Sequence, residues 1–135
     1  MSVFNPEDYW QISLKLVNQQ PSDADYRTAA NRAYYACHLL GCERGIIERT
    51  NSARDHSKLW EELRRRGMFW ANKLEVLYRI REHADYHINS EDRDNVGCSY
   101  CKISAESMWG NAKAITEDIL PRIKSMKKKD IKTPK

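Results

Sequence analysis

The 135-residue chain is poor in the residues that build small extracellular scaffolds, with only four cysteines and five glycines. Cys37, Cys42, Cys98 and Cys101 are too few and too scattered for the disulfide framework of a secreted domain, and a reducing compartment fits them. Cys98 and Cys101 have the spacing of half a zinc site. Cys37 and Cys42 do not form a matching second half, so we interpret all four as incidental thiols.

Several functional motifs are absent from the sequence. It has no Gly-x-x-x-x-Gly-Lys phosphate loop, no Gly-x-Gly-x-x-Gly turn and no His-Glu-x-x-His zinc helix, which argues against ATP hydrolysis, dinucleotide chemistry and zinc proteolysis. We expect neither a metal nor another cofactor. No apolar run approaches the roughly 20 residues of a membrane span, and the first residues lack the apolar core of a secretory signal. We therefore expect a cytoplasmic protein that does not engage a membrane.

The length suits one domain with a single hydrophobic core. The net charge of +4 is unevenly distributed, because lysines accumulate near the C-terminus. We expect residues 1–125 to form one helical body and residues 126–135 a basic, flexible tail. Lys127, Lys128 and Lys129 are candidate contacts for the RNA backbone, since clustered lysines attract phosphate, and a solvated chain end is the alternative.

Helix signals account for most of the chain. We expect helices at about 6–18, from a capping box at Ser22 to about Leu40, at 56–66 with Asp55 as cap and Gly67 as stop, at 69–87 and at 98–125. No segment alternates with a two-residue period between hairpin turns, so no sheet is expected. These patterns predict an all-α protein, a four-helix bundle with one additional short helix at 56–66.

Two segments carry a likeness to a known family. They are Asn31-Arg32-Ala33-Tyr34-Tyr35-Ala36 and Arg81-Glu82-His83-Ala84-Asp85-Tyr86-His87, with His56-Ser57 between them. Together they resemble the small prokaryotic proteins of the HEPN superfamily, over roughly residues 9–119. The resemblance implies a HEPN-like bundle, and it implies the activity of the catalytic members, which are metal-independent ribonucleases that act as toxins or antiviral effectors.

The resemblance also implies which residues act. Catalytic HEPN members carry an arginine followed, after four to six residues, by a histidine, and Arg81 and His87 satisfy that rule. It further implies a homodimer in which two such pairs face a shared groove, with RNA as substrate and an antitoxin or a nucleotidyltransferase as a further partner. Candidate supporting residues are Glu82, His83, Asp85, Arg32, Tyr35 and His38.

The chemistry suits these residue types. A histidine titrates near neutral pH and can move the proton of the RNA 2′-hydroxyl, while the planar charge of an arginine binds phosphate oxygens. Arg81 would hold the phosphate and His87 would move the proton. Six helical positions place the two side chains roughly 120° apart, so a dimeric groove, a bent helix, or His83 on the face of Arg79 would each supply the geometry.

Structural roles compete with these assignments. Arg81 lies in an apolar stripe with Leu74, Leu77 and Ala84 and can pair with Asp85. Tyr34, Tyr35 and Tyr86 suit core or interface positions, and His56 suits a helix start. Glu82 stands where many active relatives carry Asn, Asp or His, and its charge would repel a phosphate in the groove. The leading prediction is a ribonuclease, and the alternatives are a non-catalytic HEPN module that binds a nucleotidyltransferase or a nucleotide, or a structural dimerisation bundle.

Overall fold

The computed structural model describes residues 5–48, 50, 52–86 and 103–126. Within these residues the protein consists of five α-helices and contains no strand, which confirms the all-α class. The helices are α1 (Glu7–Leu16), α2 (Asp23–Glu43), α3 (Arg54–Arg65), α4 (Ala71–Tyr86) and α5 (Ala105–Lys124). None of these helices has the length and apolar character that crossing a bilayer requires.

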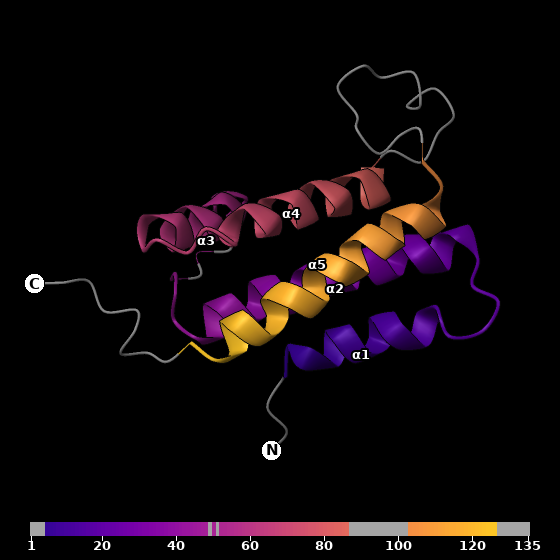
Figure 1. Ribbon diagram of the computed structural model, residues 1–135, viewed down its shortest axis with the longest axis horizontal. Helices are drawn as coiled ribbons and strands as arrows, with labels where there is room; N and C mark the ends of the chain where they lie inside the picture. The colour runs from indigo at the N-terminus through magenta and orange to yellow at the C-terminus, as the bar shows by residue number, and fades with distance from the viewer. Residues whose placement is uncertain (1–4, 49, 51, 87–102, 127–135) are drawn as a thin grey trace, which may run out of the picture.

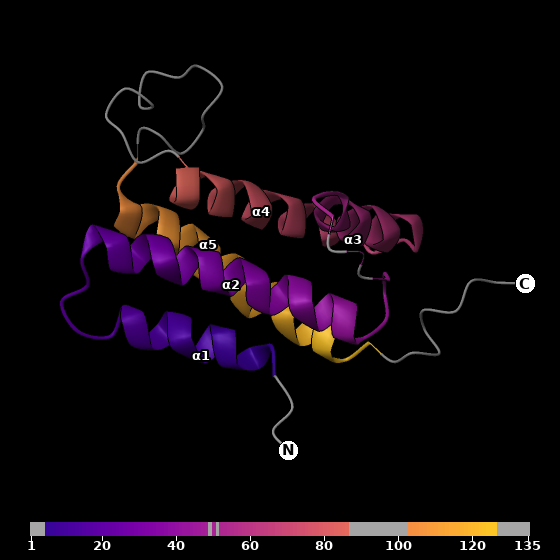
Figure 2. The ribbon, with the colours of Figure 1, turned by 180° about the vertical axis from the view of Figure 1, so that it is seen from behind.

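Helix α2 is the centre of the bundle and packs against each of the other four helices. It lies between α1 on one side and the α3–α4 pair on the other, and α5 covers it on the face toward the viewer in Figure 1. Seen from behind, α2 is in front of α5 (Figure 2). Side chains on several faces of α2 are therefore buried or lie at junctions between helices.

The start of α2 was predicted from its sequence and is confirmed. The Ser22 side chain accepts a hydrogen bond from the Asp25 backbone N–H at 3.1 Å, and the Asp25 carboxylate accepts one from the Ser22 backbone N–H at 2.9 Å. This reciprocal pair satisfies two backbone donors that a helix start leaves without helical partners. It stabilises the start of α2 at Asp23.

Small side chains let neighbouring helices approach α2 closely. Its buried residues include Ala29, Ala30, Ala33 and Ala36, each with no exposed surface. Near the end of the helix, a Cβ atom added at Gly41 would lie 2.8 Å from a terminal carbon of Leu59 on α3. The close approach of α3 to α2 brings together the side chains described in the next subsection.

Two helix starts differ from the sequence prediction. The prediction that Asp55 caps the third helix is wrong, because α3 begins at Arg54 with Ala53 at its cap. Asp55 is buried in the first turn, where it accepts hydrogen bonds from the Thr50 backbone N–H at 2.9 Å and from the Thr50 hydroxyl. The last helix begins at Ala105 after the cap Ser104, and not at residue 98.

Candidate functional site

Aromatic and histidine side chains from three helices meet where α2, α3 and α4 converge. Ring contacts join Tyr34 to His38 on its own helix, to His56 on α3 and to Tyr78 on α4, with ring centroids between 5.5 and 5.7 Å apart. The rings of His38 and His56 are closer still, at 4.7 Å. The cluster therefore contains two imidazoles in contact, contributed by residues far apart in the sequence.

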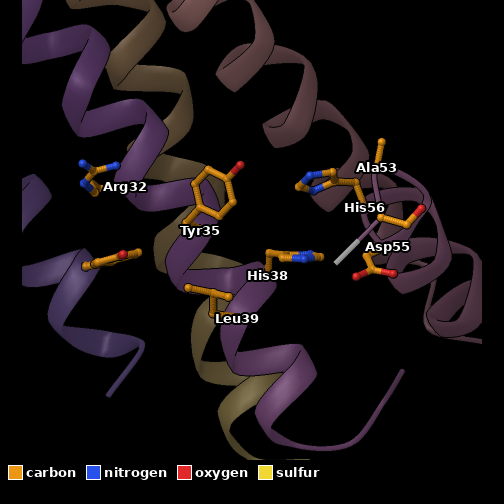
Figure 3. A pocket seen from close by; sticks show the side chains of 9 residues that line it. Arg32, Tyr35, His38, Leu39, Ala53, Asp55 and His56 are labelled. Atoms are coloured by element: carbon orange, nitrogen blue, oxygen red, sulfur yellow. The ribbon is translucent and has the colours of Figure 1, made fainter. Parts of the chain in front are cut away.

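A cavity of about 420 Å³ opens beside this cluster, between α2 and α3. Figure 3 shows the histidine rings of the two helices extending toward each other, with Arg32 and Tyr35 further along α2. The volume lies in the range of small-molecule pockets. The cavity is lined by Tyr9, Arg32, Tyr35, His38, Leu39, Ser52, Ala53, Asp55 and His56.

Tyr34 contacts the rings of both histidines and has no exposed surface. Its hydroxyl oxygen is 2.6 Å from Nδ1 of His56 and 3.5 Å from Nδ1 of His38. Burial, followed by the nearby Tyr35 and Tyr78 side chains, raises the pKa of Tyr34 far above the ordinary value of a phenol. The hydroxyl therefore keeps its proton and acts as a hydrogen-bond donor across the physiological pH range.

The surroundings of His56 favour its neutral form. Burial lowers the pKa of His56, and the positive charge of Arg81 lowers it further, while Asp55 and Glu82 act in the opposite direction. A second imidazole at 4.7 Å adds to the cost of protonating both rings at once. Neutral imidazoles can accept and donate a proton through different ring nitrogens.

Arg81 is not among the residues that line the cavity, and protein groups hold its guanidinium. Its Nε forms an ion pair with Asp85 at 3.0 Å, and its Nη2 donates a hydrogen bond to the Tyr35 hydroxyl at 3.0 Å. The guanidinium carbon lies 5.3 Å from the Tyr35 ring centroid and 5.8 Å from that of Tyr78. Asn31 donates to the same Asp85 oxygen at 2.9 Å. The sequence left open whether Arg81 acts in catalysis or pairs with Asp85, and the structure contains the pair with Asp85.

Arg32 is the arginine that lines the cavity, and it also borders a second one. Its guanidinium carbon lies 5.4 Å from the Tyr9 ring centroid, and its side chain donates to Asn31. The second cavity, of about 330 Å³, is lined by Ala24, Arg27, Thr28, Asn31, Arg32, Ala84 and Asp85. Arg32 thus borders both cavities, and Arg27, also on α2, lines the second.

The other predicted site residues are spread around this junction. Glu82 is half-buried beside Tyr78. Burial is the main reason that the pKa of the Tyr78 phenol is raised, and the charge of Glu82 and its hydrogen bond to Tyr78 raise the pKa further. His83 is buried at 6% exposure, whereas Arg79 is exposed and pairs with Glu75 at 2.9 Å, so those two do not form a common open face. His87, Lys127, Lys128 and Lys129 lie outside the described residues.

Sequence reasoning took His56 for a helix-start residue and Tyr34 for a core aromatic, and so left both out of the site. Tyr34 is indeed buried, and its hydroxyl is the atom that joins the two histidines. The feature of the sequence that could have pointed to His56 as a site residue is its position between the two family-like segments. Among the described residues, no group of three or more His, Cys, Asp or Glu side chains could hold a metal ion.

Comparison with known proteins gives no assignment. No family model matches the chain, and neither a curated protein nor a solved structure matches it.

The free energy of unfolding is expected to fall as the pH drops from 7.5 to 5.5, because the pKa of His56 is lower in the folded protein than its ordinary value of 6.5. The unfolded chain then binds the proton first, so the stabilising contribution is complete above pH 6.5 and is lost as the pH falls toward the folded pKa. The lowered pKa values of Glu62, Glu75 and Asp118 affect the free energy of unfolding mainly below about pH 5.

Urea denaturation of the wild type and of His56→Gln at the two pH values measures this effect. Between pH 7.5 and 5.5, the free energy of unfolding should fall less in His56→Gln than in the wild type. Equal losses in the two proteins would show that His56 is not the group responsible.

Proposed function

We propose that the protein is a HEPN-like, metal-independent RNA endonuclease that acts as a toxin or an antiviral effector. The observation that carries the proposal is that two histidines in contact, His38 and His56, line one cavity together with Arg32. The family-like segments support it as well, because Arg81 of the second segment donates to the Tyr35 hydroxyl of the first. These residues belong to α4 and α2, which pack together.

The proposed reaction uses the nucleophile that RNA itself carries. The 2′-oxygen attacks the adjacent phosphorus, the bond from phosphorus to the 5′-oxygen breaks, and a 2′,3′-cyclic phosphate forms. One imidazole takes the proton of the 2′-hydroxyl and the other supplies a proton to the departing 5′-oxygen. Arg32, on the wall of the same cavity, binds the phosphate oxygens and stabilises their charge in the transition state.

The shape of this surface suits a polynucleotide better than a single nucleotide. Arg32 borders both the 420 Å³ and the 330 Å³ cavities. A phosphate bound there would have one neighbouring nucleoside on each side along α2. Tyr9 and Tyr35 offer aromatic faces in the larger cavity, and bases stack on such faces with little regard to sequence.

The direct test is RNA cleavage by the purified protein in EDTA. We expect cleavage to continue at an unchanged rate and the upstream fragment to end in a 2′,3′-cyclic phosphate, because the nucleophile is the RNA 2′-oxygen. A DNA oligonucleotide of the same sequence is the matched control and should remain intact. Loss of activity in EDTA, or equal cleavage of DNA, would contradict the mechanism.

A homodimer is part of the proposal, as the HEPN resemblance implies, with the Arg81–His87 segments of two chains beside one groove. Light scattering at micromolar concentration should give twice the mass of the 15.9 kDa chain. A monomer that still cuts RNA would show that one chain contains the whole site, as the cavity between α2 and α3 would allow.

The second candidate function is a non-catalytic module that binds a nucleotide or a nucleotidyltransferase. The observation in its favour is the engagement of Arg81, whose side chain is 12% exposed and bound to Asp85 and Tyr35. An arginine held in this way serves to order the cavity wall. Nucleotide binding measured by calorimetry, in a protein that does not cut RNA under any of the above conditions, would support this function instead.

A further inference from the structure

One buried hydroxyl connects the two histidines of the cavity. The Tyr34 oxygen lies 2.6 Å from Nδ1 of His56 and 3.5 Å from Nδ1 of His38, and the tyrosine has no exposed surface. A phenol has a single proton, so it can donate to only one of the two nitrogens. With the other histidine it forms a hydrogen bond only by accepting one. The two neutral rings must then carry their protons on different nitrogens.

The distances indicate the direction of the chain of hydrogen bonds. The shorter contact is assigned as a donation from the Tyr34 hydroxyl to Nδ1 of His56, and this assignment leaves the ring proton of His56 on Nε2. The longer contact is then assigned as a donation from Nδ1–H of His38 to the Tyr34 oxygen, and this assignment leaves a lone pair on Nε2 of His38. That Nε2 is 3.9 Å from the Cys42 sulfur, whose thiol is a weak donor suited to a nitrogen lone pair.

We infer that Tyr34 holds His38 and His56 in opposite tautomers and relays a proton between them, so that the pair works as base and acid without either ring becoming charged. The inference deepens the proposed ribonuclease function and rests on it for the chemical step. Tyr34 does not touch the RNA and acts as a positioning residue through the two histidines. His38 is the base, and His56 is the acid.

The step balances in atoms and charge. Nε2 of His38 takes the proton of the 2′-hydroxyl as the bond from the 2′-oxygen to phosphorus forms, and Nδ1–H of His38 passes its proton to the Tyr34 oxygen. The Tyr34 proton moves to Nδ1 of His56. Nε2–H of His56 then gives its proton to the 5′-oxygen as the bond from phosphorus to that oxygen breaks. Both rings end neutral with their tautomers exchanged, and Tyr34 ends as a phenol.

The charges around the relay favour this neutral path. Burial and Arg81 both oppose an imidazolium at His56, so an acid that stays neutral avoids an unfavourable charged state. Asp55 and Glu82 act the other way and are the weaker influences. Within the part of the chain that the structure describes, the titratable and charged groups around the two rings include Tyr34, Tyr35 and Cys42 from α2, Asp55 from α3, and Tyr78, Arg81 and Glu82 from α4.

The first measurement is the tautomer of each ring, from imidazole ¹⁵N shifts of the full chain at pH 8. Signals are assigned with His38→Gln and His56→Gln. We expect the proton on Nδ1 in His38 and on Nε2 in His56. In Tyr34→Phe, which keeps the ring and removes the hydroxyl, the preference at His38 should disappear. Tyr78→Phe removes a hydroxyl from the same cluster and should leave both tautomers unchanged.

The second measurement is the dependence of the cleavage rate on pH. A relay between neutral rings is active whenever both are unprotonated, so kcat should rise with pH up to about 7 and then remain level to about pH 9. An imidazolium acid would instead give a bell-shaped profile that falls on the alkaline side. Tyr34→Phe should lower kcat about a hundredfold with KM within about twofold, because only proton transfer is removed.

The outcomes separate this inference from the proposed function. Opposite tautomers that depend on the Tyr34 hydroxyl support the hydrogen-bond chain even in a protein that cuts no RNA, and the ribonuclease function then fails alone. The same tautomer in both wild-type rings, or opposite tautomers that persist in Tyr34→Phe, would overturn the inference. A bell-shaped profile in an active enzyme would overturn the neutral relay.

Discussion

Replacing His56 with glutamine is expected to slow RNA cleavage by about a hundred- to ten-thousandfold, and replacing His38 with glutamine should have an effect of similar size. Under the proposed mechanism, each substitution removes one of the two groups that exchange protons with the RNA. KM should change little, because Arg32 and the aromatic walls of the cavity remain. The measurement is single-turnover cleavage at saturating RNA, with helicity followed by circular dichroism.

The double variant tests whether the two histidines act together. If they are the ends of one proton path, His38→Gln combined with His56→Gln should be no slower than the slower single variant, because either change already interrupts the path. If the cleavage rate of the double variant fell by the product of the two single-variant factors, the two histidines would have independent roles. His83→Gln is the matched control, since His83 is buried on α4 and does not line the cavity.

His87→Gln separates the cavity from the Arg81–His87 pair that the family resemblance implies. If the α2–α3 cavity is the reaction site, this variant retains cleavage while the His38 and His56 variants lose it. Loss of cleavage in His87→Gln alone, with the other two variants active, would place the reaction at the Arg81–His87 pair. The RNA mechanism would then stand with different residues.

The fold could be predicted from local patterns to the extent that local contacts determine it. The capping box at Ser22 was predicted correctly, because both of its hydrogen bonds join residues three positions apart. The Asp55 cap was wrong, because that carboxylate is used by Thr50 in the preceding loop. An aspartate before a helical pattern gives the same local signal whether it caps the helix or stabilises the loop that leads into it.

The site was harder to predict because its contacts connect distant segments. The stripe on α4 showed that Arg81 faces other helices, and the sequence offered Asp85 as its partner, since the two are four positions apart. It could not show that His56 reaches Tyr34, because that contact depends on how closely α3 approaches α2 at Gly41 and Leu59. Spacing along one helix indicates a face, whereas the approach of two helices depends on the whole core.

Arg81→Ala is expected to destabilise the protein by about 3 kcal/mol, near the lower end of the range for breaking a buried ion pair. The Asp85 side chain retains 27% exposure, so water can compensate part of its lost partner. The variant also loses the guanidinium that lies against the Tyr35 and Tyr78 rings. Urea denaturation at pH 7.5 measures this loss directly.

Asp85→Asn shows whether Arg81 also binds RNA, because it removes the competing negative charge and keeps the guanidinium between its aromatic neighbours. If Arg81 only orders the cavity wall, this variant should lose stability and leave KM within about twofold. If the guanidinium binds phosphate, its release from the ion pair should lower KM, and Arg81→Ala should raise KM beyond what its helicity explains. Arg81→Ala with wild-type stability and weakened RNA binding would contradict the structural role assigned to the Arg81–Asp85 pair.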